Sequence, residues 1–206
     1  MTFSGFPTAA LDFYDDLEAN NSKEFWTAHK HVYDEAVAGP MKELTAALAD
    51  EFGQAKIFRP YRDVRFSADK TPYKTSQGAM VADGTGTGFY LEISAAGVRT
   101  GAGCHMMESA RINTFRAAVA HDIYGPQLEK VLADLRGFEV GGESLKTTPK
   151  GYDKDHPRIE LLRHKSLTAG RMLGFDPVIH TDKLIDTVRG DWRALRPMVE
   201  WLNTHT

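Results

Sequence analysis

Hydrophobic residues in the first quarter of the chain recur at helical spacing. Leu11, Tyr14 and Leu17 lie three positions apart, so a helix would carry all three on one face. Apolar residues repeat in the same way over 25–37 and again over 44–52. The pattern therefore predicts three amphipathic helices near the N-terminus.

The ends of these helices are also marked in the sequence. Asn21 precedes Glu24 by three positions, which is the spacing of a capping box at the start of a helix. Gly39-Pro40 follows the second apolar stretch, and this pair favours the end of a helix. We expect the second helix to run between these two signals.

A period of two replaces the helical period in the middle of the chain. Phe89, Leu91 and Ile93 alternate with polar residues, as they would in a strand with one buried face. A turn at 95–97 leads into 98–104, which we predict to be the returning strand of a hairpin. The three apolar side chains should face helices, because their one-sided pattern needs a cover.

The last part of the chain combines helices with short strands. Helices are predicted from Ser109 and from Gly125-Pro126, and strands within 137–148 and 166–175. Thr181 is the expected cap of a final pair of helices. Helices grouped around a block of strands favour the α+β class over a βαβ alternation. We predict a mainly antiparallel sheet with helices packed on it.

Size and composition fit one domain. The chain has 206 residues, 42% of them hydrophobic, and we expect residues 1–206 to form a single globular domain. No apolar run approaches the roughly 20 residues of a membrane span, and residues 1–16 lack the pattern of a secretory signal. A single cysteine, Cys104, excludes an internal disulfide and is typical of a reducing compartment. We expect a soluble cytoplasmic protein that does not bind membranes.

Positive charge is concentrated in residues 56–74. This stretch, KIFRPYRDVRFSADKTPYK, contains six Lys or Arg and two Asp, a net charge of +4, whereas the whole chain carries −3. Prolines and aromatic residues between the cations favour a braced segment, and an Arg side chain offers a planar fork of donors to carboxylates and phosphates. We predict that the block binds an anion through five cations: Arg59, Arg62, Arg65, Lys70 and Lys74.

A structural interpretation of the same block stands beside the functional one. Asp63 lies between Arg62 and Arg65, so these residues could form an ion-pair network that only stabilises the fold. We predict that Asp63 is buried and orients at least one Arg. The two interpretations are compatible.

A second basic block, GYDKDHPRIELLRHK, occupies 151–165. A helix beginning at Pro157 would gather four polar side chains on one face: His156, Glu160, Arg163 and His164. His156 and Glu160 are the predicted proton-transfer residues if a reaction occurs, and a solvated helix face is the alternative. The cations of the block would form a second wall of the anion pocket: Arg158, Arg163 and Lys165.

Other chemistries lack their motifs. His29 and His31 would point about 200° apart on a helix, and Cys104-His105 has no second pair at ligand spacing. The glycines within 83–88 do not form a phosphate-binding loop, because no GxxxxGK[ST] or GxGxxG precedes a helix. We predict no metal and no cofactor.

Four blocks carry a resemblance to a known family: SGFP…AL.FY..LEANNSKEFW, RPYRDVRFSADKTPYK, GYDKDHPRIELLRHK and W..LRP…WL. Together they resemble the bacterial and fungal family called domain of unknown function 2461 over nearly the whole chain. The chain differs from that pattern at Phe25-Trp26, where the order is reversed, and at Cys104–Met107. The resemblance implies no activity, since the family is uncharacterised.

Three classes of function are compatible with these observations. The first is a pocket for a small phosphate- or carboxylate-bearing molecule, with or without catalysis. The second is nucleic-acid binding with Tyr61, Phe66 and Tyr73 as stacking platforms, which the net charge of −3 and pI near 6.2 disfavour. The third is a non-catalytic interaction or scaffold protein. We favour the first.

Overall fold

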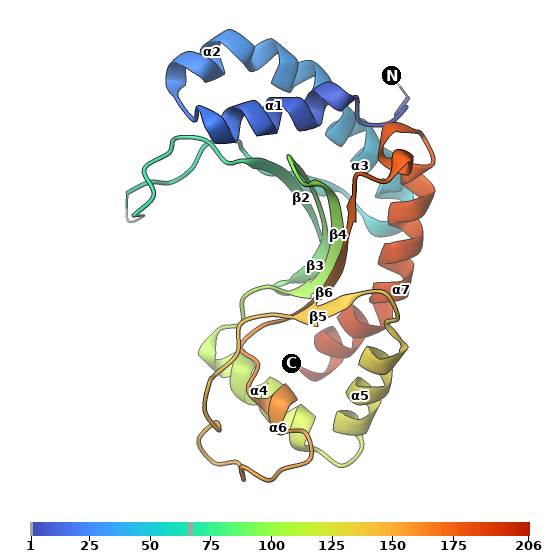
Figure 1. Ribbon diagram of the computed structural model, residues 1–206. Coiled ribbons are helices and arrows are strands. Elements are labelled where there is room, and N and C mark those ends of the chain that lie inside the picture. The colour runs from blue at the N-terminus through green and yellow to red at the C-terminus, as the bar shows by residue number, and fades with distance from the viewer. Residues whose placement is uncertain (1, 66–67) are drawn as a thin grey trace. The chain divides into compact units, whose positions relative to one another are not determined.

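Six strands form one sheet in the computed structural model, which describes residues 2–65 and 68–206 (Figure 1). Their order is β1-β2-β3-β4-β6-β5, and the sheet is antiparallel. The strands are β1 (Ala55–Ile57), β2 (Ser76–Ala82), β3 (Thr87–Ser94), β4 (Gly97–Cys104), β5 (Glu139–Gly141) and β6 (Leu167–Gly174). The predicted α+β class with a mainly antiparallel sheet is confirmed.

The helices occur before, between and after these strands. They are α1 (Thr8–Ala19), α2 (Lys23–Val32), the π-helix η1 (Tyr33–Ala38), α3 (Gly39–Phe52), α4 (Ser109–Ala120), α5 (Tyr124–Asp134), α6 (Ile159–Leu162), the 3₁₀-helix η2 (Pro177–His180) and α7 (Leu184–His205). None of them, among the described residues, combines the length and the apolar character needed to cross a membrane.

The domain gathers into two compact units that share the strands. The first consists of Met1–Val81, Tyr90–Thr100 and Met172–Arg189. The second consists of Ala82–Phe89, Gly101–Arg171 and Gly190–Thr206. Each unit is described by itself below.

The core of the first unit follows the helical spacing of the sequence. Leu11, Tyr14 and Leu17 of α1 are all buried, which confirms the first predicted helix. The apolar face of α3 is buried as well. Leu91 and Ile93 are fully buried, so the predicted inward face of β3 is also confirmed.

The start of α2 differs from the predicted capping box. Ser22 is the N-cap, and its hydroxyl accepts a hydrogen bond from the backbone N–H of Phe25 at 3.1 Å. Asn21 instead bonds the backbone of Tyr73 with both ends of its amide, at 3.0 and 3.1 Å. The predicted role of Asn21 is therefore wrong, because a long-range partner outside the helix competes successfully for its side chain.

The predicted break at Gly39-Pro40 is also wrong. Helix α2 continues through η1 into α3, and the N–H of Gly39 donates to the carbonyl of Asp34, five residues earlier. Pro40 lies in the first turn of α3, where its missing N–H and fixed φ are tolerated. The wider turn of the π-helix lets the chain remain helical up to Gly39-Pro40, so the helix does not end there.

The second unit contains α4, α5, β5, α6 and the C-terminal part of α7. Phe115 is fully buried and meets Trp201 edge to face, with ring centroids 6.1 Å apart. Helix α7 is one helix of 22 residues rather than the predicted pair, and it contains Pro197. Buried apolar residues at helical spacing on both sides of Pro197 explain why the helix continues past it.

Candidate functional site

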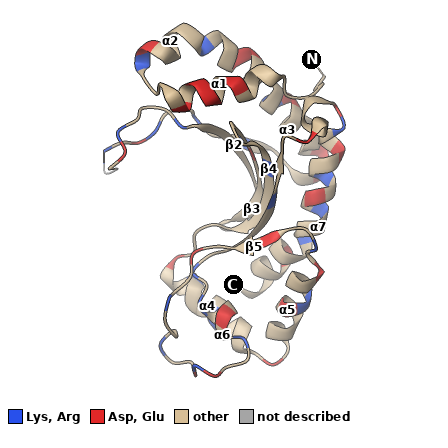
Figure 2. Cartoon of the chain, in the orientation of Figure 1, with Lys and Arg blue, Asp and Glu red and all other residues tan. Residues whose placement is uncertain are grey.

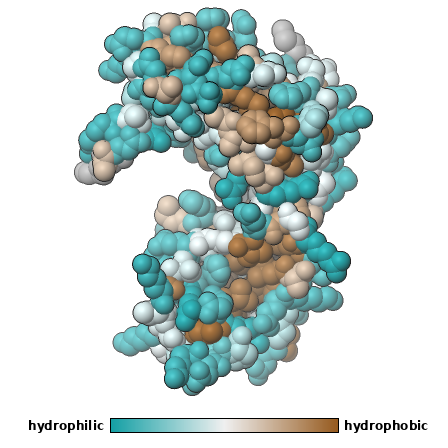
Figure 3. Space-filling view, in the orientation of Figure 1, coloured by the Kyte–Doolittle hydropathy of each residue, from teal (hydrophilic) through white to brown (hydrophobic). Residues whose placement is uncertain are grey.

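The first basic block forms a hairpin-like segment that leads into β2 of the first unit. The N–H of Lys74 donates to the carbonyl of Pro60 at 2.8 Å, and the N–H of Arg62 donates to that of Pro72 at 2.9 Å. The prolines therefore contribute only carbonyls, so their lack of an N–H costs nothing here. The hairpin extends beyond β2 (Figure 1), Lys and Arg positions recur along it (Figure 2), and its surface is mostly hydrophilic (Figure 3).

One side of the hairpin is aromatic and packs on α2. Tyr61 and Tyr73 pair as an isolated bridge, and the Tyr73 ring stacks on Trp26 with centroids 4.2 Å apart and planes 6° apart. Tyr73 is buried, whereas Tyr61 is 48% exposed. The indole N–H of Trp26 is buried and has no hydrogen-bond partner among the described residues. This packing, with the two Asn21 hydrogen bonds, fixes the base of the hairpin.

The other side of the hairpin is cationic. Alternation along an extended chain turns Arg62 and Lys74 away from the face that carries the two tyrosines. The Lys74 ammonium lies 5.4 Å from the centroid of the Phe58 ring, a cation–π contact. Burial, together with the positive charges of Arg59 and Arg62, lowers the pKa of Lys74. Arg59 and Arg62 therefore each repel the charge of Lys74 in the free protein.

The cations of the block differ in their partners. Arg62 forms an ion pair with Asp69 and donates to the Thr71 hydroxyl at 3.0 Å. Lys70 donates to the backbone carbonyl of Val64 at 2.9 Å. Within residues 2–65 and 68–206, no carboxylate lies within 4.0 Å of the charged nitrogens of Arg59 or Lys74. These two cations can accept an external anion without losing an ion pair.

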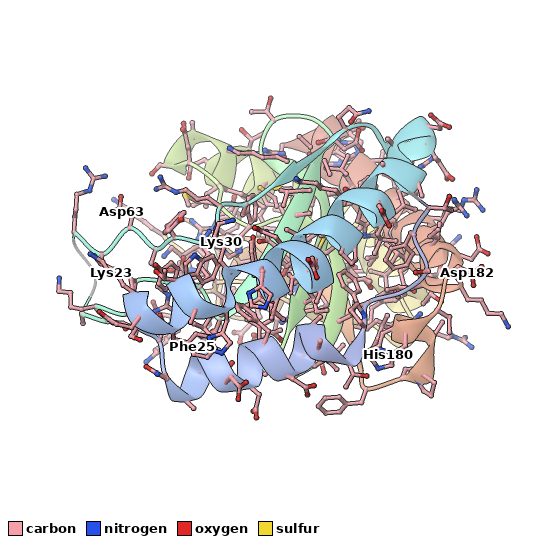
Figure 4. The ribbon with its side chains drawn as sticks, turned by 90° about the horizontal axis from the view of Figure 1, so that it is seen from above. Lys23, Phe25, Lys30, Asp63, His180 and Asp182 are labelled. Carbon is pink, nitrogen blue, oxygen red and sulfur yellow. The ribbon has the colours of Figure 1, made fainter. Side chains whose placement is uncertain are left out.

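Asp63 pairs with Arg65 rather than being buried. The guanidinium of Arg65 donates to both carboxylate oxygens, at 2.9 and 2.6 Å, and this lowers the pKa of Asp63. Both side chains are exposed, and Figure 4 shows Asp63 on the projecting hairpin. The predicted burial of Asp63 is wrong, because the hairpin leaves this stretch in solvent. Phe66, the third predicted stacking residue, lies outside the described residues.

A polar group on β2 and β3 adjoins the cationic side. The hydroxyl of Tyr90 donates to Glu92 Oε2 at 2.6 Å, and the hydroxyl of Ser76 donates to the same oxygen at 3.0 Å. Burial and the Glu92 carboxylate raise the pKa of Tyr90. A Cβ at Gly78 would lie 2.8 Å from the Tyr90 hydroxyl and 3.1 Å from Phe58, so glycine makes room for both rings. Sequence reasoning missed this group, although the polar positions of the β3 alternation contain two of its members.

Arg158 of the second block is held inside the second unit. Its side chain is 9% exposed. Its guanidinium donates to the carbonyls of Val119 at 2.7 Å and Ala120 at 3.1 Å, which are the last two residues of α4. The carboxylate of Glu129 lies 3.8 Å away. Arg158 therefore supplies donors and positive charge to the C-terminus of α4.

The remaining predicted residues of the second block lie around α6. This helix spans only Ile159–Leu162, so the predicted helical face from His156 to His164 does not form. The Glu160 carboxylate accepts from Arg163 at 2.8 and 3.0 Å, and the His156 Nδ1 accepts from the N–H of Arg158 at 3.0 Å. The two basic blocks belong to different units, and a pocket formed by both remains a prediction.

Residues 9–201 match a family model described as "conserved hypothetical protein (DUF2461)". The chain belongs to the DUF2461 family. No curated protein matches the chain. The match covers both basic blocks but attaches no activity to them, so the chemistry of this DUF2461 protein has to be argued from its own side chains.

Two cavities contrast in charge. One of about 650 Å³ in the first unit is lined partly by acidic residues: Asp34, Glu35 and Glu43. None of the predicted cations lines it. One of about 240 Å³ in the second unit includes Lys165, a predicted ligand-binding residue. In the described part of this DUF2461 protein, no group of three or more His, Cys, Asp or Glu could hold a metal ion.

Proposed function

We propose that this DUF2461 protein binds a small anionic molecule, with a phosphate or carboxylate group, on the cationic side of the hairpin. Arg59, Arg62 and Lys74 would hold the anion. The observation that supports this most directly is the lowered pKa of Lys74, caused by burial and by the two arginines. Burial is the larger cause, and a bound anion would offset the positive charges of Arg59 and Arg62 that add to it.

The partners of the cations support a ligand more than a structural role. Arg62 is held by Asp69, so its guanidinium is oriented before any ligand arrives. Arg59 and Lys74 lack such a carboxylate among the described residues. A fold that needed these charges only for stability would pair them, because unpaired like charges in proximity are unfavourable.

The surroundings suggest how the uncharged part of a ligand would be accommodated. The Phe58 ring lies beneath Lys74, and the Tyr90 ring lies 6.4 Å from it, centroid to centroid. An organic phosphate or carboxylate could place its carbon skeleton on this aromatic pair. Arg65 and Lys70 would add to the attraction from farther along the hairpin.

Three further predictions concern features outside the hairpin: catalysis, the second basic block and the cellular location. His156 and Glu160 remain the predicted proton-transfer residues if a reaction occurs, and both belong to the second unit. Arg163 and Lys165 remain predicted anion-binding residues of the second unit, whereas Arg158 binds the carbonyls at the end of α4. We further propose a cytoplasmic location, because a chain with one cysteine, the buried Cys104, does not depend on disulfides.

Thermal unfolding in the presence of anions tests the proposal. At a ligand concentration 100 times its Kd, binding stabilises the folded state by about 2.7 kcal/mol, which corresponds to about 5–11 °C in Tm for a chain of this size. Inorganic phosphate, nucleotides and organic acids form the screen. Lys74→Met should abolish the shift, whereas Lys56→Met, the loss of an exposed lysine of the same unit, should preserve it. Equal shifts in both variants, or no shift with any anion, would refute the site.

Nucleic-acid binding is the alternative function for the same surface, and a second experiment distinguishes it from binding of a small anion. Tyr61 is half exposed at the base of the hairpin, and aromatic side chains beside cations can stack single-stranded bases. Binding of an oligonucleotide would show a steep decrease of log affinity with log salt, because several phosphates release counterions. A small anion held by three cations would show a shallower dependence.

A further inference from the structure

The 240 Å³ cavity of the second unit is lined by several hydrogen-bond donors. One wall is a face of α4, where four residues recur at helical spacing: Ser109, Ile112, Asn113 and Arg116. The rest of the lining consists of Leu145 and Lys165. The lining therefore contains two cations, an amide, a hydroxyl and two aliphatic side chains, and no carboxylate.

Hydrogen bonds fix the walls of this cavity. The guanidinium Nε of Arg116 donates to the carbonyl of Leu162 at 2.9 Å, which joins α4 to the end of α6. The N–H of Leu145 donates to the carbonyl of Arg163 at 2.8 Å, so the segment that carries Leu145 is held against the segment that leads to Lys165. The cavity is thus bounded by elements that are tied to one another.

The charges of the cavity are only partly neutralised. Lys165 forms an ion pair with Glu143, whose side chain is 68% exposed. Arg116 has the Leu162 carbonyl as its partner, and no carboxylate lies within 4.0 Å of its guanidinium among the described residues. The Nη donors of Arg116 can therefore bind an external oxyanion while Nε keeps its hydrogen bond to the Leu162 carbonyl.

We propose that this cavity is a second binding site, specific for a small oxyanion such as a phosphate or carboxylate group. Arg116 and Lys165 would supply charge-assisted hydrogen bonds, and Ser109 and Asn113 neutral ones. The volume lies below the roughly 300–1,000 Å³ of sites for drug-sized ligands, so the occupant is a small molecule or a small terminal group. This site is independent of the hairpin site, since every lining residue belongs to the second unit.

Backbone-amide NMR on the full chain, titrated with inorganic phosphate and separately with succinate, tests this inference. The amides of Ser109, Asn113, Arg116 and Lys165 should shift with saturation, and the tighter of the two anions identifies the favoured group. Lys165→Gln should weaken binding at least tenfold, as expected for a lost charge-assisted hydrogen bond. Lys146→Gln, an exposed neighbour that does not line the cavity, should leave the affinity unchanged.

Several outcomes would overturn the inference. Shifts confined to the hairpin would support the first site and reject this one, and absence of shifts in both titrations up to tens of millimolar would reject it too. Equal weakening by Lys165→Gln and Lys146→Gln would mean diffuse attraction rather than a site. A spectrum of Lys165→Gln that overlays the wild type away from 109–116 shows that the variant is folded, so a lost affinity is then assigned to the cavity.

Discussion

Replacing Arg158 tests whether this arginine of the second block stabilises the fold. The side chain reaches the last carbonyls of α4 past Gly125, where a Cβ would lie 2.3 Å from the arginine Nε and 2.2 Å from the Val119 carbonyl oxygen. Only glycine leaves this path open. Arg158→Ala would remove both strong hydrogen bonds, to Val119 and Ala120, and the positive charge at the helix C-terminus.

The magnitude follows from the contacts of Arg158. A hydrogen bond from a charged donor contributes about 1.5–3 kcal/mol, and two that share a guanidinium are not additive, so we expect a loss of about 2–4 kcal/mol. For a chain of about this size, 1 kcal/mol corresponds to about 2–4 °C in Tm. Arg158→Ala should therefore lower Tm by about 4–16 °C, and Arg158→Lys by less, because lysine keeps the charge but not the fork.

Calorimetric or spectroscopic melting, supported by urea unfolding, measures this effect. The matched control is Arg136→Ala, because Arg136 is exposed in the same unit and its side chain has no partner among the described residues. That variant should change the free energy of unfolding by less than about 0.5 kcal/mol. If Arg158→Ala melts with the wild type but loses stabilisation by anions, Arg158 is a ligand-binding residue and the structural assignment is wrong.

Three further predictions concern the first unit. Lys74→Met should raise Tm at pH 7 without ligand, because it removes a charge whose pKa is lowered in the folded state. The gain in Tm should shrink as the pH approaches 10.5, and a lower Tm at pH 7 would contradict the unfavourable surroundings of this charge. Burial and nearby Asp34 and Tyr61 raise the pKa of Tyr33 to about 12, so stability should fall as the pH rises from about 10 to 12. Urea unfolding of Tyr33→Phe should show a weaker fall, and equal slopes would refute the assignment. Asn21→Ala should lower the free energy of unfolding by about 1–3 kcal/mol, because it removes two hydrogen bonds to the Tyr73 backbone. Asn20→Ala should change it little, and equal effects of the two variants in thermal melts would contradict the role of Asn21.

The fold was largely predictable from periodicity. Leu11, Tyr14 and Leu17 are buried at helical spacing, and Leu91 and Ile93 are buried at strand spacing, because burial of apolar faces decides where such elements pack. The predictions that were wrong relied on local signals for helix caps and helix ends, which long-range contacts overrode. Pro197 lies inside α7, since buried apolar positions continue on both sides of it and tertiary packing outweighs a local breaker.

The candidate site was predictable only in part. Charge and aromatic content identified the hairpin, but the chain alone could not distinguish Lys74, which lacks a carboxylate partner among the described residues, from Arg62, which pairs with Asp69 seven positions away. Arg116 was missed because its chemistry depends on Leu145 and Lys165, which lie far from it in sequence. Helical spacing from Ser109 was the available signal, and it becomes informative only once Leu145 and Lys165 are known to line the same cavity.

The pairing of each cation separates structural from binding roles better than its place in a basic block does. Arg158 and Arg65 both belong to such blocks, yet one bonds helix carbonyls and the other a neighbouring aspartate. Lys74 and Arg116 lack a carboxylate within ion-pair distance among the described residues, and each lies beside further positive charge. An unpaired cation next to another cation lowers stability unless an anion joins them. If anions bind at both Lys74 and Arg116, this protein has two separate anion sites. The thermal-shift screen tests the first site, and the NMR titration tests the second independently.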